Sequence, residues 1–168
     1  KPVMWSPVEK TALAEAEVEY HDKESFTVWV KFQVVGTGDA TLDSAKVVIW
    51  TTTPWTMPSN KAVVYGAGIS YGLYEVIGRP EECWARIGER FILSDALAED
   101  VLGRARLEPS MYRRLCDITP EDLAKIQLRH PLHGADGGEG EWDDIRDFRA
   151  ADFVTDSEGT GFVHCAPS

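Results

Sequence analysis

The segment Thr51–Asn60 constrains the fold more than any other part of the sequence, because it ends a strand and cannot continue as regular structure. The run Ala45–Trp50 before it is short, apolar and rich in β-branched residues, which predicts a strand. Pro54 and Pro58 then remove two backbone donors and fix φ, which excludes a central strand or a regular helix. We expect a stiff, irregular loop whose hydroxyls and free N–H groups suit a polar ligand. The alternative is a turn whose threonine hydroxyls cap only their own backbone.

The remaining pattern predicts a β-rich domain. Apolar and polar residues alternate over Phe26–Val34, with Phe26 on the buried face, as in a half-buried strand. Ser94 and Thr119 are candidate N-caps of two helices, the first closed by Gly103 and the second ending near Ile126. The fold class that follows is α+β and β-rich: a closed or nearly closed β-barrel with a few helices packed outside. Further short strands are expected at residues 62–65, 71–77, 83–87, 153–154 and 161–165, with a glycine-rich acidic loop over 134–147.

Length, charge and cysteine content narrow the possible functions. A chain of 168 residues predicts one domain with its own core. Its net charge of −11 argues against a surface that binds an RNA backbone, but it allows a site that binds only a terminal nucleotide. Cys83, Cys116 and Cys165 show no CxxC spacing, which argues against a disulfide framework and favours a reducing compartment. His130 and His133 have no third ligand nearby in sequence, so no metal site is expected. No apolar run approaches the about 20 residues of a membrane helix, so no membrane span is expected.

Three stretches, in order along the chain, together match the pattern of a known family. Residues 1–7 with 11–20 open the chain, Trp50–Asn60 reads WTTTPWTMPSN, and Glu158–Pro167 reads EGTGFVHCAP. The middle stretch resembles the threonine-rich peptide WTTTPWTLPAN in the editing domain (connective peptide 1) of isoleucyl-tRNA synthetase, a class I aminoacyl-tRNA synthetase. The last stretch resembles the GTGxVHTAP motif of the same domain.

Individual positions within these stretches refine the resemblance. Thr53 and Trp55 point to the isoleucine enzyme, because the related valyl and leucyl enzymes carry an arginine and an acidic residue at these places. The chain departs from the family pattern at Met57 for leucine, at Ser59 for alanine and at Cys165 for threonine.

The resemblance covers the whole chain and implies one editing domain over residues 1–168, with residues 1–20 leading in from the parent enzyme. Lys1 is not an initiator methionine and Ser168 ends the chain after a proline, so we expect a fragment that stops within the site motif. In the family, an aspartate a few residues beyond this motif holds the substrate ammonium. Whether the fragment is active without that residue is left open.

The resemblance implies an aminoacyl-tRNA deacylase that serves an isoleucine–tRNA ligase. A pocket made for isoleucine excludes the smaller valine only weakly, so a second site must hydrolyse Val-tRNA(Ile). The implied partners are the 3′-terminal adenosine of tRNA(Ile) carrying valine, and the rest of the synthetase. Post-transfer editing in the cytoplasm is implied, with pre-transfer editing and an organellar parent left open. No cofactor is expected in this domain, because ATP and Mg²⁺ belong to the synthetic site of the parent.

Ester hydrolysis needs a positioned water and stabilisation of the oxyanion. No Ser-His-Asp arrangement is evident, so we expect direct water attack, oriented by hydroxyls of the loop and of the substrate ribose. The resemblance implies that the loop binds the adenosine and the ester, that Trp55 walls the pocket and that His164 excludes isoleucine by size. By position, the catalytic set is Thr52, Thr53 and Asn60, and the substrate-binding set is Thr51, Trp55, Thr56 and His164.

We expect Thr51–Asn60 and the strand around His164 to face one pocket. His164 is expected to act as a size filter and not as a base, because no acidic residue lies beside it in sequence. Neighbours on a strand point to opposite faces, so His164 and Cys165 cannot form a nucleophilic pair. Two alternatives remain: a nucleotide- or aminoacyl-binding module without turnover, and a structural domain whose polar loop meets another part of the parent.

Overall fold

The computed structural model describes residues 2–138 and 140–166, so Lys1, Pro167 and Ser168 of the quoted stretches lie outside the described residues. The helices are η1 (Glu15–Glu17), α1 (Ala40–Asp43), η2 (Pro54–Ser59), α2 (Ala98–Arg104), η3 (Pro109–Met111) and α3 (Pro120–Leu123), where η marks a 3₁₀ helix. The strands are β1 (Trp5–Ser6), β2 (Thr11–Ala12), β3 (Val28–Val35), β4 (Ala45–Thr51), β5 (Ala62–Tyr65), β6 (Tyr71–Val76), β7 (Arg90–Ser94), β8 (Tyr112–Ile118), β9 (Gln127–Arg129), β10 (Ile145–Ala150) and β11 (Phe162–Cys165).

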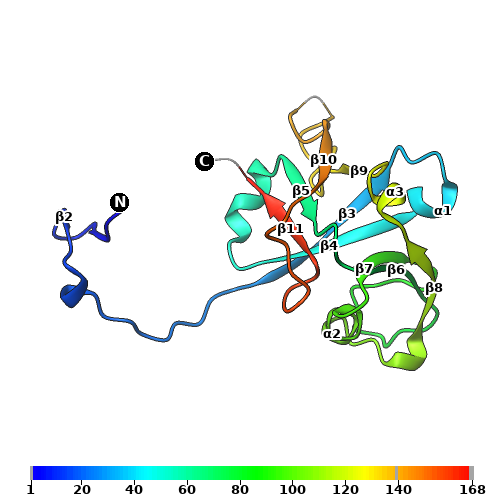
Figure 1. The fold of residues 1–168 in the computed structure, drawn as a ribbon, viewed down its shortest axis with the longest axis horizontal. Coiled ribbons are helices and arrows are strands. Elements are labelled where there is room, and N and C mark those ends of the chain that lie inside the picture. The colour runs from blue at the N-terminus through cyan, green and yellow to red at the C-terminus, as the bar shows by residue number, and fades with distance from the viewer. Residues whose placement is uncertain (1, 139, 167–168) are drawn as a thin grey trace.

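Nine of these strands form one open sheet with the order β11-β5-β10-β9-β3-β4-β7-β6-β8 (Figure 1). Its neighbours are antiparallel except for the pairs β5–β10 and β4–β7, which are parallel. The sheet bends but its two outer strands, β11 and β8, are not paired with each other within the described residues. The prediction was a closed or nearly closed barrel, and closure is wrong, whereas the β-rich character with few helices is confirmed.

The edges of the sheet show why no closure is needed. β11 has only four residues, and β8 carries exposed charged side chains at its outer position. Arg113 pairs with Glu75, and Arg114 pairs with Asp95 and Asp117. Short strands and charged side chains protect an edge from further pairing as well as closure does. Local alternation in the sequence predicts strands but does not reveal how the outer strands are protected.

The sheet also buries both of its faces, as two separate cores show. On one face, Leu73 and Ile92 belong to a core shared with β3, β5 and β11. On the other, Tyr74 and Phe91 pack with Val101 and other residues of α2. Figure 1 shows α2 beneath the strands β6 and β7. Strands buried on both faces need cover from a helix on one side and from the bent sheet on the other.

Gly161 determines how β11 lies on the first core. Its φ is +78°, and a Cβ there would lie 2.6 Å from Cβ of Ser94. The Tyr71 hydroxyl donates a hydrogen bond to the Gly161 carbonyl at 2.7 Å. Only glycine fits this left-handed, close approach, which explains the second glycine of the Gly-Thr-Gly stretch.

Several predicted elements are confirmed and others are wrong. The strands over 62–65, 71–77 and 161–165 are present, and Thr119 caps α3 through a reciprocal capping box with Asp122. No strand forms over 83–87 or 153–154; these residues lie in bends, turns and irregular segments. β1, β2 and β7–β10 were not predicted. In β8, β9 and β10 most side chains are exposed, so these strands show no continuous apolar pattern. The helix expected after Ser94 begins only at Ala98, because β7 runs to Ser94, and Gly103 lies inside it.

Residues 2–27 form a β1–β2 hairpin and an extended segment that reaches away from the sheet (Figure 1). Phe26, expected on the buried face of β3, is 90% exposed because the strand begins at Val28. Other apolar side chains of this segment are also exposed: Val3, Met4, Trp5, Val8 and Tyr20.

Two further observations concern residues 2–138 and 140–166. None of the helices there is long and apolar enough to cross a membrane. Within residues 2–138 and 140–166, no group of three or more His, Cys, Asp or Glu side chains could hold a metal ion.

The carboxylate of Asp95 makes the stability of the fold depend on pH. The guanidinium of Arg114 and the hydroxyls of Tyr74 and Ser70 lower its pKa from 3.8 to about 2, against a smaller opposing effect of burial. A depressed pKa contributes stability that is fully present above the unfolded value and is lost as pH falls through the folded value. We therefore expect Asp95→Asn to lower the free energy of unfolding by about 1–2 kcal/mol at pH 7. Urea unfolding should show this difference shrinking between pH 3.8 and about 2.

Asp117→Asn is the matched control, because Asp117 also contacts Arg114 but is 83% exposed. It should change the free energy of unfolding by less than about 0.5 kcal/mol. An Asp95→Asn effect that is equally large at the acid end of this range would contradict the assignment.

Candidate functional site

The segment after β4 folds as the 3₁₀ helix η2, which begins at Pro54 and contains Pro58. Thr53 precedes the helix at φ −124° and ψ 65°, away from the helical region that a following proline disfavours. Inside the segment, the Thr56 N–H donates to the Thr53 carbonyl at 3.0 Å, and the Asn60 N–H donates to the Met57 carbonyl at 3.0 Å. The tight i→i+3 pattern therefore replaces the irregular loop that was expected, and two prolines are accommodated.

Three threonine hydroxyls of this segment form a chain of contacts. Oγ1 of Thr51 lies 3.1 Å from Oγ1 of Thr53, which lies 3.4 Å from Oγ1 of Thr56. The Thr56 hydroxyl donates to the Thr53 carbonyl at 2.7 Å, and the Thr51 hydroxyl accepts from the Thr53 N–H at 3.1 Å. The hydroxyls thus cap their own backbone, as the alternative interpretation holds, and also gather in one cluster. We call Thr51, Thr53 and Thr56 the hydroxyl cluster.

His164 on β11 joins this cluster from a distant part of the chain. β11 runs antiparallel to β5, with His164 opposite Val63. This pairing places Nε2 of His164 3.2 Å from Oγ1 of Thr56 and Nδ1 3.4 Å from Nδ2 of Asn60. The structure therefore brings the threonine-rich segment and the His164 strand together.

The contacts of His164 define its tautomer. Because the single hydroxyl proton of Thr56 goes to the Thr53 carbonyl, Thr56 must accept from His164, so Nε2 carries the proton. Nδ1 is then an acceptor, and the amide of Asn60 supplies a donor. Burial lowers the pKa of His164, and no other influence opposes it. The imidazole is therefore neutral near pH 7, with both nitrogens engaged.

Asn60 lies behind His164 and is fully buried. Its Nδ2 donates to the carbonyl of Ala62 at 2.8 Å and lies 3.4 Å from the carbonyl of Cys165. Thr52 and Trp55 are exposed, Trp55 to 71%. The predicted site residues therefore divide into an exposed pair, a buried pair formed by Thr51 and Asn60, and the half-buried Thr53, Thr56 and His164.

Two residues that contact this segment carry no sequence signal for such a role. Nε2 of His130 donates to the Met57 carbonyl at 3.0 Å, and Nε1 of Trp142 donates to the Pro58 carbonyl at 2.9 Å. The sequence raises only a metal-ligand role for His130, which the lack of a third ligand argues against, and no role for Trp142. These contacts join residues 73 and 84 positions apart, so no local pattern could indicate them.

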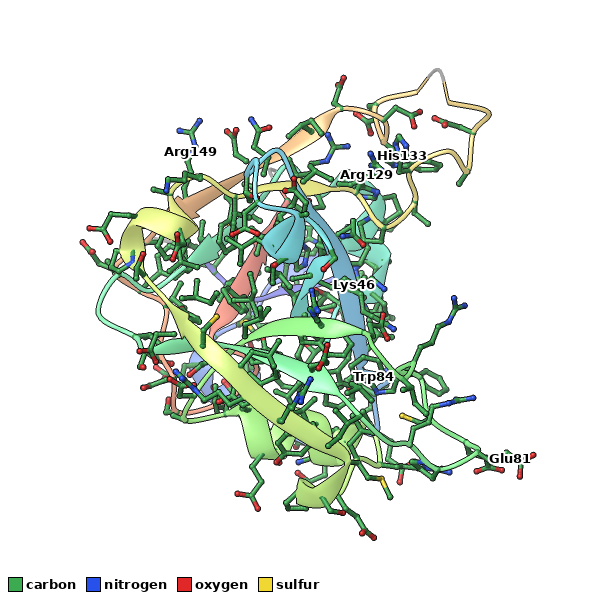
Figure 2. The ribbon with its side chains drawn as sticks, turned by 90° about the vertical axis from the view of Figure 1, so that its right-hand side faces the viewer. Lys46, Glu81, Trp84, Arg129, His133 and Arg149 are labelled. Carbon is green, nitrogen blue, oxygen red and sulfur yellow. The ribbon has the colours of Figure 1, made fainter. Side chains whose placement is uncertain are left out.

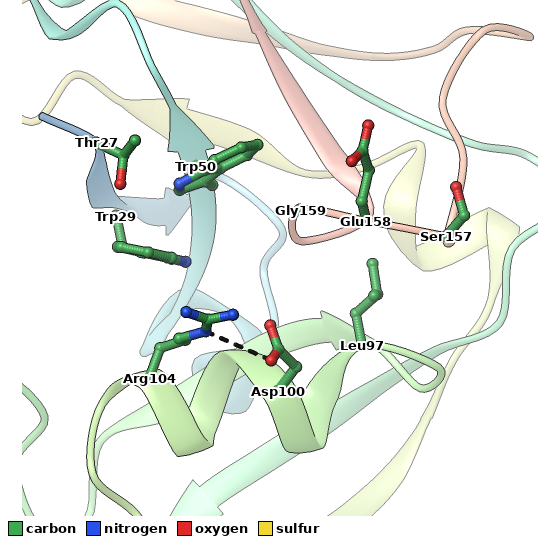
Figure 3. Close-up of a pocket in the computed structure, with 9 residues that line it drawn as sticks. All are labelled: Thr27, Trp29, Trp50, Leu97, Asp100, Arg104, Ser157, Glu158 and Gly159. Carbon is green, nitrogen blue, oxygen red and sulfur yellow. Dashed lines mark ion pairs between the residues drawn. The ribbon is translucent and has the colours of Figure 1, made fainter. Parts of the chain in front are cut away.

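A hollow of about 510 Å³ lies elsewhere and is drawn in Figure 3. Trp29 and Trp50 form one side of it, and the paired Arg104 and Asp100 of α2 form another. Glu158 and Gly159, which belong to the last of the three matching stretches, also line it. Neither His164 nor any residue of the hydroxyl cluster lines this hollow, so the hollow is separate from the candidate site.

Comparison with known proteins identifies a group of relatives. The chain is 73% identical over 168 residues to an isoleucine–tRNA ligase of Ruegeria pomeroyi. It is 52% identical over 167 residues to the enzyme of that name from Rhodopseudomonas palustris, and 49% identical over 170 residues to that of Brucella abortus. These matches cover 99–100% of this chain, which spans 16–17% of the length of these curated relatives. No protein-family model matches the chain.

Two solved structures share the fold. The crystal structure of GlLeuRS-CP1 matches with a TM-score of 0.56 and 17% identity, covering 82% of this chain and 53% of that one. The editing domain of the P. falciparum cytosolic leucyl-tRNA synthetase matches with a TM-score of 0.58 and 10% identity, covering 83% of this chain and 60% of that one. At such identities the likeness shows the fold alone.

Proposed function

We propose that this chain, which is homologous to one segment of the isoleucine–tRNA ligases, is an editing domain that hydrolyses Val-tRNA(Ile). The observation that carries the proposal is the junction of the hydroxyl cluster with a neutral His164. The fold shared with two leucyl-tRNA synthetase structures supports an editing role. All 168 residues form the one domain, and residues 1–20 lead in from the rest of the synthetase.

The chemistry of the site favours attack by water. Both nitrogens of His164 are engaged, and burial disfavours its protonated form, so it is poorly suited to accept a proton from a nucleophile. Burial also raises the pKa of the Cys165 thiol, which keeps it a thiol and a weak nucleophile. Each threonine hydroxyl can donate one hydrogen bond and accept two, which suits the cluster to orient a water and the ester. The exposed Thr52 extends the same polar surface toward the substrate.

His164 then acts through the volume of its side chain, which limits the size of the amino acid that can bind. Its ring is half-buried and held from both sides by Thr56 and Asn60, so it cannot turn away from a larger ligand. A rigid ring at this place excludes the extra methylene of isoleucine while admitting valine. The exposed Trp55 supplies an apolar wall of the pocket.

The substrate is the terminal adenosine of tRNA(Ile) carrying valine, acted on after transfer. With a net charge of −11, the domain holds only that end while other parts of the cytoplasmic synthetase bind the RNA backbone. ATP and Mg²⁺ act in the synthetic site of the parent and not here.

Replacing Thr53 by valine tests the proposal. Valine keeps the shape of threonine but removes the middle hydroxyl of the cluster. In the full-length enzyme we expect deacylation of Val-tRNA(Ile) to fall by about 10²-fold, because the water and the ester lose their alignment. Single-turnover deacylation of Val-tRNA(Ile) gives this rate.

Thr11→Val is the matched control, since Thr11 lies in the hairpin that reaches away from the sheet (Figure 1). It should leave the rate unchanged. A Thr53→Val enzyme that binds Val-tRNA(Ile) normally and deacylates it at the wild-type rate would refute a role for the cluster. If the wild-type enzyme binds the substrate but never deacylates it, the domain is a binding module.

A further inference from the structure

Two aromatic side chains hold the carbonyl groups at the end of η2. Nε2 of His130 donates to the carbonyl of Met57, and Nε1 of Trp142 donates to the carbonyl of Pro58, the next residue. The two rings are nearly parallel, with an angle of 9° and centroids 6.2 Å apart. His130 is only 2% exposed, and its Nδ1 accepts from the N–H of Leu132 at 3.1 Å. Both of its nitrogens therefore have partners, and its orientation is determined.

A short series of contacts leads from this pair to His164. The Met57 carbonyl accepts from His130 and also from the N–H of Asn60. The side chain of Asn60 in turn meets Nδ1 of His164. A shift of the Met57 carbonyl therefore moves the backbone that carries Asn60, and with it the partner of His164.

A third contact supports the same end of the segment. Nζ of Lys61 pairs with Glu141 at 2.7 Å, and the backbone N–H of Lys61 donates to the Cys165 carbonyl at 2.9 Å. Arg146 reaches back to the carbonyls of Glu141 and Asp144 and so holds the backbone beside Trp142. His130, Trp142 and Glu141 thus contact Met57, Pro58 and Lys61, respectively.

We propose that His130 and Trp142 are positioning residues of the editing site, which hold η2 so that Thr56 and Asn60 meet His164. This inference rests on the proposed function for its kinetic consequence. Neither residue need touch the substrate, because each acts on the backbone of η2. The catalytic rate should therefore depend on both contacts, while the affinity for the tRNA should not.

Trp142→Phe is the decisive variant, because it keeps a stacking ring and removes only the N–H donor to Pro58. In the full-length enzyme we expect kcat for Val-tRNA(Ile) deacylation to fall about three- to tenfold, as for the loss of one hydrogen bond, with KM unchanged. Trp84→Phe is the control: Trp84 packs edge-on against Phe91 in the second core. Figure 2 shows Trp84 well away from His133, which lies three residues after His130 in the sequence. An equal loss in both variants, or none in Trp142→Phe, would overturn the proposal.

His130 is tested by a pair of variants. His130→Leu removes the donor to Met57, and we expect kcat to fall by about 10²-fold, because small displacements of catalytic groups are costly. His130→Gln restores an N–H donor near the place of Nε2 and should recover at least about tenfold of that loss. If glutamine recovers nothing while both variants unfold at the same temperature, the hydrogen bond to Met57 does not matter.

A readout independent of catalysis separates this inference from the proposed function. In the chain labelled with ¹⁵N-histidine, the ring signals of His164 report its tautomer. We expect Trp142→Phe to shift these signals and Trp84→Phe to leave them in place. Unchanged signals in Trp142→Phe would refute the positioning role even if the enzyme edits. A shift in an enzyme that does not deacylate would refute the function and keep the positioning role.

Discussion

Replacing His164 by alanine is expected to make the full-length enzyme hydrolyse its own correct product, Ile-tRNA(Ile). The substitution removes an imidazole that Thr56 and Asn60 hold rigidly beside the hydroxyl cluster. The space left is larger than the methylene that distinguishes isoleucine from valine. The excluded ester can then bind, and the water-orienting hydroxyls remain to hydrolyse it.

The expected rates separate the size filter from a base. For a filter, hydrolysis of Val-tRNA(Ile) should stay within roughly tenfold of wild type, or ~1.4 kcal/mol in the barrier, while that of Ile-tRNA(Ile) rises well above background. For a general base, the Val ester should lose about 10²- to 10⁴-fold and the Ile ester should gain nothing. Single-turnover deacylation of the two esters by wild type and His164→Ala distinguishes these outcomes.

His133→Ala is the control for the loss of an imidazole. His133 is partly exposed, and its Nδ1 lies 2.6 Å from Oδ1 of Asp143. The substitution should leave the hydrolysis rates of both esters unchanged. Collapse of Val-tRNA(Ile) hydrolysis in His164→Ala, with Ile-tRNA(Ile) untouched, would refute the size filter.

Replacing Asn60 by leucine is expected to damage both stability and catalysis. Leucine has a similar volume but leaves the carbonyl of Ala62 and Nδ1 of His164 without their buried donor. We expect the free energy of unfolding to fall by about 2–3 kcal/mol, since unpaired buried polar groups are costly. That corresponds to a loss of roughly 4–10 °C in the melting temperature. Thermal unfolding of the chain measures it.

The kinetic effect of Asn60→Leu follows from the release of His164. Without the amide, the imidazole can change its tautomer and turn within the site. We expect Val-tRNA(Ile) deacylation to fall by about 10²-fold and discrimination against isoleucine to weaken. Ser59→Ala, at the exposed neighbouring position, should change neither quantity. A stable Asn60→Leu enzyme with normal discrimination would show that the buried amide does not hold His164.

The outcome for the site shows which relations can be predicted from sequence. Pro54 and Pro58 indicated that β4 must end near Thr51, and it does. The resemblance brought the segment Thr51–Asn60 and His164 into one site, and the structure places them in contact. The burial of Asn60 could not be predicted, because an amide in a polar loop is usually exposed.

The sequence by itself determined the local features of this protein. Residue patterns place β3, β4, β5 and β6, and the reciprocal cap at Thr119 begins α3, because these features depend on neighbouring residues. Only the tertiary structure decided that the sheet stays open, that β8 and β10 exist, and that His130 and Trp142 hold η2. Those outcomes depend on side chains and strands brought together from many tens of residues apart. Long-range contacts of this kind leave no period or spacing in a single sequence, so packing alone selects them.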